Sequence, residues 1–148
     1  MVAIGLWGVI AGGRALWAWP LAFVATTLVG FTAATLGLHV PLVEPAIATS
    51  IVVLGLLVAF AVRAPVWLGA VIAALFAFFH GHAHGTEALV SGAAPVAYAS
   101  GFSLATATLH AAGIGIGLSI ARSAGAPLLR ATGGLVAIGG VVLATGLA

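Results

Sequence analysis

The residues of this chain best suited to chemistry are its five histidines and two glutamates, and three of the histidines fall within five positions. His80, His82 and His84 are followed by Glu87 in a run that otherwise holds small or apolar residues and one threonine. Because each residue of an α-helix turns by about 100°, His80, His84 and Glu87 would share one face, and His82 would point elsewhere. Imidazole nitrogens followed by a carboxylate suit Ni(II), Zn(II), Co(II) or Cu(II). The spacing therefore predicts single metal-binding steps along one helix face.

A fourth ligand is expected at His110, in the next apolar segment. It belongs to a stripe of polar and small residues with helical spacing: Ser103, Thr106, His110, Gly113 and Gly117. Small residues also recur every four positions beside the histidine face: Ala73, Ala77, Gly81 and Gly85. Such a stripe allows a neighbouring helix to approach closely. We expect that neighbour to be the next segment, which would bring His110 level with His80.

Each histidine also has a structural interpretation, because imidazoles inside membrane helices often hydrogen-bond to a neighbouring helix. For His82, on the second face, we favour such a capping or interhelical hydrogen bond over a role as a ligand. For His110 the alternative is a bond to a carbonyl exposed by the nearby glycines. For His80, His84 and Glu87 together we favour a metal pathway, since ionisable groups at membrane depth are costly and usually line a pathway.

A second candidate site lies in an outer loop, where His39 and Glu44 stand close together in the sequence. With Glu87 they would form a mouth that raises the local concentration of cations. The alternative is that both are ordinary solvated loop residues.

The elements that position these residues must be membrane helices. The chain has 148 residues, of which 64% are hydrophobic and only 4% charged, and its mean hydropathy is +1.34. A soluble domain carries about 25% charged residues, so most side chains here must face lipid or other protein. The composition also excludes a nucleic-acid-binding surface, which needs a basic patch. Cysteine is absent, so disulfides and thiolate metal sites are impossible.

The hydrophobic segments predict an all-α polytopic transmembrane bundle, with one domain over residues 1–148. A crossing helix needs about 20 apolar residues, and five segments meet that length: 16–38, 45–62, 66–89, 96–121 and 127–147. Glu44 and Pro45 suit a helix start, because proline fits the first turn and an acid favours the positive end of the dipole. Residues 1–11 are too short to cross, and we interpret them as the second half of a first crossing.

The charges separate by sign. All arginines lie on one side of the membrane: Arg14 in the first break between segments, Arg63 in the third, and Arg122 and Arg130 around the fifth. The excess of positive charge predicts that these loops are cytoplasmic, with the glutamates and the C-terminus on the outer side of the membrane. The tryptophans are expected to anchor the segment ends in the lipid interface: Trp7, Trp17, Trp19 and Trp67.

The histidine run, Phe79 to Glu87, resembles the motif of the HupE/UreJ family of nickel permeases. Similarity extends to residues 5–7, 12–17, 43–45, 53–57 and 105–113. The resemblance implies a small inner-membrane carrier that supplies Ni(II), or Co(II) in some relatives, for the maturation of hydrogenases and ureases. It also implies that His80, His84 and Glu87 belong to the metal pathway. The family's further motif, HPxxGxDH on the first membrane helix, would stand just before Met1, so we expect it either in a longer reading frame or to be missing from this member.

The sequence therefore predicts a secondary transporter or permease for Ni(II), or for a similar ion such as Co(II) or Zn(II), and not an enzyme. No tightly bound cofactor is expected; the partners are the metal ion and the lipid bilayer, with no nucleic acid, and a homo-oligomer is left open. One alternative is a non-transporting membrane scaffold or assembly factor with structural histidines. Another is an intramembrane metal hydrolase, which needs a metal-bound water and a nearby acid or base. The motif HExxH is absent, and Glu87 follows the histidines, which disfavours the hydrolase.

Overall fold

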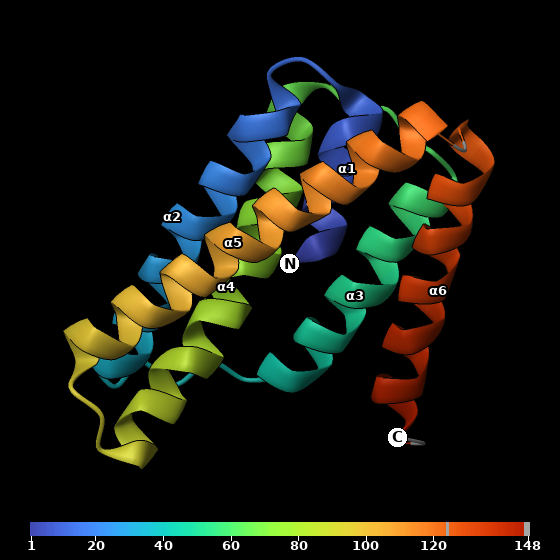
Figure 1. The fold of residues 1–148 in the computed structure, drawn as a ribbon. Helices are drawn as coiled ribbons and strands as arrows, with labels where there is room; N and C mark the ends of the chain where they lie inside the picture. The colour runs from blue at the N-terminus through green and yellow to red at the C-terminus, as the bar shows by residue number, and fades with distance from the viewer. Residues whose placement is uncertain (124, 147–148) are drawn as a thin grey trace.

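The computed structural model describes residues 1–123 and 125–146, and this part of the chain is a bundle of six α-helices (Figure 1). The helices are α1 (Val2–Ala11), α2 (Ala15–Thr35), α3 (Val43–Ala59), α4 (Val66–Ser91), α5 (Pro95–Ser123) and α6 (Gly125–Thr145). Short turns join them, so helices that follow one another in the chain run in opposite directions. The all-α prediction is confirmed.

Within the described residues, four helices are long and apolar enough to cross a membrane: α2, α4, α5 and α6. The other two are shorter apolar helices; α3 has 17 residues, a length of about 25 Å at the usual helical rise. The predicted count of five full crossings is therefore not confirmed. The ten residues of α1 begin near the middle of the bundle and run to one end (Figure 1), as expected of a partial span. The predicted end of the last segment, Leu147, lies outside the described residues.

The boundary between α5 and α6 differs from the prediction of a loop over residues 122–127. Helix α5 continues to Ser123 and α6 begins at Gly125. Pro127 stands in the first turn of α6, where a missing backbone N–H costs no hydrogen bond. Gly125 has a φ of 72°, which glycine adopts without the strain of a Cβ, so the chain reverses direction in very few residues.

The small-residue stripe of α4 packs against α2, and the prediction that α5 would occupy it was wrong. A Cβ added to Gly81 would collide with the backbone of Thr27, and one added to Gly85 would lie 2.6 Å from the carbonyl oxygen of Phe31. The stripe thus allows a neighbouring helix to approach closely, as expected, but that neighbour is α2 and not α5. Two other pairs use the same device, because Cβ atoms at Gly113 and Gly55 would press on α1 and α6.

Opposite charges lie at opposite ends of the bundle. We call one end the arginine end, since it carries Arg14, Arg63, Arg122 and Arg130 near the turns of α1–α2, α3–α4 and α5–α6. The other is the carboxylate end, where Glu44 begins α3 as predicted and Glu87 ends α4. At the arginine end, Nε of Arg130 donates to the carbonyl oxygen of Ala59 at 2.8 Å, which places a cation at the negative end of α3.

Two of the tryptophans are core residues, which corrects their prediction as lipid anchors. Trp7 and Trp19 are fully buried, with ring centroids 4.1 Å apart. Their indole N–H groups donate to the carbonyl oxygens of Val62 and Val66, each at 2.8 Å. They therefore fix the α3–α4 turn against α1 and α2, whereas Trp17 and Trp67 are exposed as expected.

Candidate functional site

His80 lies in the wall of a central cavity of about 330 Å³. All six helices contribute to this wall: Val2 of α1, Phe23 of α2, Ser50 of α3, His80 of α4, Leu109 of α5 and Val136 of α6. Apart from Val2, which begins α1, each of these residues stands near the midpoint of its helix. The cavity is therefore at mid-depth in the bundle, and an imidazole and a hydroxyl group are among its few polar groups.

Ser50 determines how the His80 ring is presented. Nε2 of His80 lies 3.0 Å from Oγ of Ser50, and the same Oγ lies 2.6 Å from the carbonyl oxygen of Ile47. A carbonyl can only accept, so the hydroxyl proton goes to Ile47 and the Nε2–H group of His80 donates to Ser50. This assignment leaves the lone pair of His80 on Nδ1, the atom able to bind a metal ion.

Ser50 was not among the site residues predicted from the sequence. Its signal was a hydroxyl residue in the middle of an apolar segment, but nothing in the sequence aims that hydroxyl at α4. Ser50 is buried, and its bond to His80 joins α3 to α4. The residue thus has a supporting role for the predicted ligand.

His110 is buried on α5 with 1% of its surface exposed. Neither of its ring nitrogens has a hydrogen-bond partner within the part of the chain that the structure describes. The expected alternative, a bond to a carbonyl, is therefore not made. Its ring lies edge-on to Phe23, with centroids 5.1 Å apart, and Phe23 lies 5.6 Å from the His80 ring. Phe23, also missed from sequence, thus contacts both predicted ligands.

His84 turns toward α5. Its ring stacks on Phe102, with centroids 4.8 Å apart and planes 10° apart, and it lies 6.2 Å from the Tyr98 ring. One turn of helix separates it from His80, but the neighbours differ, because α2 and α3 surround His80 whereas α5 covers His84. The metal-binding residues predicted along one face of α4 therefore lie in two different environments.

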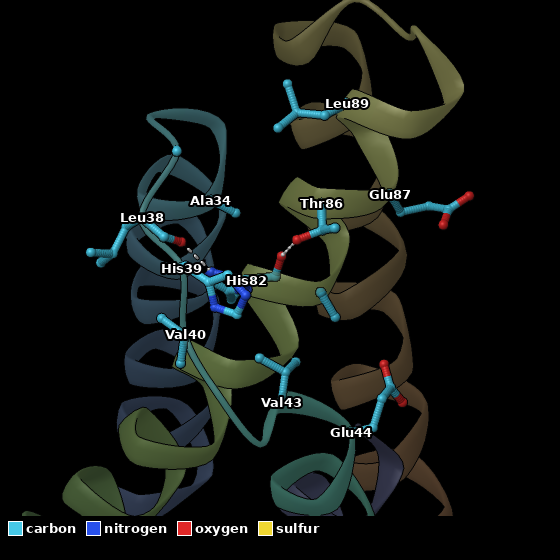
Figure 2. A pocket seen from close by; sticks show the side chains of 12 residues that line it. Ala34, Leu38, His39, Val40, Val43, Glu44, His82, Thr86, Glu87 and Leu89 are labelled. Carbon is cyan, nitrogen blue, oxygen red and sulfur yellow. Dashed lines mark hydrogen bonds between the residues drawn. The ribbon is translucent and has the colours of Figure 1, made fainter.

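The predicted mouth residues line one pocket at the carboxylate end (Figure 2). This carboxylate-end pocket has a volume of about 480 Å³, and its wall includes His39, Glu44, His82, Thr86 and Glu87. Its two carboxylates come from different helices, α3 and α4, and both are exposed. The fold thus gathers two acids that stand 43 positions apart in the sequence.

His82 makes the structural bond that its position on the second face predicted. Its Nε2 lies 2.8 Å from the carbonyl oxygen of Leu38, in the turn between α2 and α3. The other ring nitrogen, Nδ1, is buried and has no hydrogen-bond partner among the described residues. The bond connects α4 to the turn that borders the carboxylate-end pocket.

No cage for a metal ion is formed in this conformation. Within residues 1–123 and 125–146, no three side chains of His, Cys, Asp or Glu lie close enough to hold one ion together. The imidazoles are distributed instead: His82 lines the carboxylate-end pocket, His80 lines the central cavity, and His110 lies beyond Phe23.

These features define an apolar helix bundle with helices long enough to cross a membrane and with ionisable groups held in its interior. A family model described as HupE / UreJ protein matches residues 1–143. Protein HupE of Rhizobium leguminosarum bv. viciae is 41% identical over 146 residues, which cover 99% of this chain and 76% of that relative. The chain belongs to the HupE/UreJ family, as the histidine motif predicted. No solved structure matches it significantly.

Proposed function

We propose that this protein is an inner-membrane permease for Ni(II), or for a similar divalent transition-metal ion, that supplies the maturation of a hydrogenase or urease. The observation that carries the proposal is His80 at the wall of a mid-depth cavity bordered by all six helices. Ionisable side chains at that depth are costly and usually belong to a pathway. Imidazole is a preferred ligand of nickel, cobalt and zinc. Membership of the HupE/UreJ family supports the same function.

The pathway begins at the carboxylate-end pocket, where Glu44 and Glu87 attract the hydrated cation. The ion then exchanges water for single imidazoles, at His84 and His80 and then at His110. A series of weak sites suits transport, because an ion held by many ligands would leave slowly. With the arginine end in the cytoplasm, the membrane potential favours inward movement by about 2.3 kcal/mol per charge for each 100 mV.

Phe23 is the side chain shared by the two imidazoles of this pathway. Its ring centroid lies 5.6 Å from that of His80 and 5.1 Å from that of His110. We expect an ion that moves from one imidazole to the other to pass close to this ring, and a rotation of Phe23 is part of the proposed transport step.

The rival function is a scaffold whose histidines only join helices. The hydrogen bonds of His80 and His82 are compatible with a scaffold. The His110 side chain supports transport instead, because a histidine retained for its hydrogen bonds would be expected to make one.

Uptake of radioactive Ni(II) into proteoliposomes that contain the full chain tests the proposal. His80→Ala should abolish uptake without loss of folded protein, because Ser50 keeps its bond to Ile47. Thr108→Ala is the control, since that exposed hydroxyl bonds only to its own helix, at the carbonyl of Leu104. If uptake is unchanged in the variant that combines His80→Ala with His84→Ala, the permease function is rejected.

A further inference from the structure

His82 is a buried histidine to which the proposed pathway gives no role. Only 7% of its surface is exposed. Its Nε2 must carry the proton, because the carbonyl oxygen of Leu38 can only accept. Its Nδ1 is then an acceptor with a lone pair, buried and without a donor among the described residues. Such an unpaired group costs about 1–3 kcal/mol, and a native structure that retains one often does so for a ligand or an ion.

The surroundings of His82 have the form of a metal-binding imidazole. In metal sites, a ligating histidine usually donates its other ring N–H to a carboxylate or a backbone carbonyl, which fixes the tautomer and the orientation of the ring. The bond from His82 to Leu38 is of this kind, and it leaves Nδ1 as the ligating atom. Every neutral imidazole that donates one N–H keeps a lone pair on its other nitrogen, and at His82 that nitrogen belongs to a residue in the wall of an acidic pocket.

The carboxylate-end pocket supplies charge and room beside His82. Its wall includes His82 together with the carboxylates Glu44 and Glu87. Figure 2 shows the His82 ring beside the Leu38 turn, with Glu44 at the start of α3 and with the Glu87 side chain pointing away from the ring. A volume of about 480 Å³ accommodates an ion with much of its hydration shell, since one water occupies about 30 Å³ in the liquid.

We propose that this pocket binds a divalent transition-metal ion through Nδ1 of His82, with water and one carboxylate, Glu44 or Glu87, completing a weak coordination shell. The site is separate from the central cavity of His80. Its role as the capture step for transport rests on the proposed function, whereas metal binding by His82 does not. The exposed carboxylates reach the ion by side-chain rotation, which accounts for the lack of a closed ligand cage before the ion binds.

The matched variants are His82→Gln and Ser100→Gln. Glutamine at position 82 retains an N–H donor for the carbonyl of Leu38 but lacks an imidazole lone pair. Ser100 receives the same new residue outside the pocket, because it is exposed near the start of α5 and its hydroxyl bonds only to its own helix, at the carbonyl of Val96. We expect His82→Gln to raise the Ni(II) concentration for half-maximal uptake by at least about tenfold with an unchanged maximal rate, and Ser100→Gln to change it by less than about twofold, as for a residue outside the coordination shell.

Nitrogen NMR gives a test that is independent of transport. The full chain, with isotope-labelled histidine and leucine carbonyls, is placed in phosphatidylcholine nanodiscs and titrated with Zn(II), a diamagnetic probe. The ring whose Nε2 couples to a leucine carbonyl is His82, so its signals are assigned in the wild-type protein even if His82→Gln fails to fold. We expect its Nδ1 resonance to shift while Nε2 keeps its proton.

The outcomes separate the two proposals. An Nδ1 resonance of His82 that does not move at saturating Zn(II) overturns the inference, whatever the uptake assay shows. A shifted resonance in a wild-type protein that takes up no Ni(II) supports the metal site and rejects the permease. Equal half-saturation in wild type and in folded His82→Gln refutes the capture role.

Discussion

Replacing His110 with leucine separates a structural role of this imidazole from a functional one. The side chain is 1% exposed, and neither ring nitrogen has a hydrogen-bond partner within the described part of the chain. Leucine fills most of the same space with apolar atoms. The substitution therefore removes two unpaired polar atoms and breaks no hydrogen bond that the structure contains.

The expected stability change follows from two opposing terms. Removing a buried, unsatisfied polar group is favourable by about 1–3 kcal/mol. Losing the edge-on contact with Phe23 is unfavourable by about 0.5–1.5 kcal/mol. The free energy of unfolding should therefore change by between about −0.5 and +2.5 kcal/mol. Uptake of Ni(II), in contrast, should fall to background, because the pathway loses its last imidazole.

The same substitution at His82 provides the control. His82→Leu breaks the bond from Nε2 to the carbonyl of Leu38. Side-chain hydrogen bonds between membrane helices contribute about 0.6 kcal/mol on average and up to about 1.7 kcal/mol. This variant also removes the buried, unpaired Nδ1, as His110→Leu removes unpaired nitrogens, but it breaks a hydrogen bond as well. His82→Leu should therefore be less favourable to stability than His110→Leu by about the value of that bond.

The assay measures reversible unfolding in bicelles, by steric trapping, alongside radioactive Ni(II) uptake into proteoliposomes. The reasoning is refuted if His110→Leu destabilises the protein by more than about 1 kcal/mol, the typical net value of one hydrogen bond. Such a result would mean that the imidazole has a structural partner. A stable His110→Leu protein with full uptake would remove His110 from the pathway.

Two further predictions concern the support of His80 and the charge of the pocket. Ser50→Ala should raise the Ni(II) concentration for half-maximal uptake by about 10–100-fold, because a supporting hydrogen bond orients the ligand. The control is Ser119→Ala, which removes an exposed hydroxyl bonded to its own helix and should leave this concentration unchanged. Equal effects of the two substitutions would contradict the role of Ser50. Glu44→Gln combined with Glu87→Gln should slow initial uptake at low Ni(II) and abolish its decrease between about 10 and 150 mM salt, where the Debye length falls from about 30 to about 8 Å. A salt dependence that persists in this double variant would show that other charges attract the ion.

The positions of the helices could be predicted from the sequence, because a run of about 20 apolar residues between glycine, proline or charged breaks has few other structures in lipid. The start of α3 at Glu44 and Pro45 followed from the chemistry of a helix N-terminus. The predicted loop over residues 122–127 was too long, because proline fits the first turn of a helix and does not require a loop.

The neighbours of each helix could not be predicted in the same way. The stripe that contains Gly81 and Gly85 showed that another helix could approach, but it matches any helix of suitable shape, and α2 occupies it instead of α5. Trp7 and Trp19 show the same difficulty, because an apolar side chain in a membrane protein can face either lipid or the interior. Hydropathy does not distinguish the two environments.

The class of this protein, its family motif and the separation of arginines from glutamates follow from the sequence, since they depend on composition and on spacing along a single helix. The bond of His80 to Ser50, the stacking of His84 on α5 and the buried lone pair of His82 follow from the packing of the helices. These contacts depend on the register and rotation of helices that are distant in the chain. That arrangement results from many weak packing contacts summed over whole helix faces, and no periodicity within one segment encodes it.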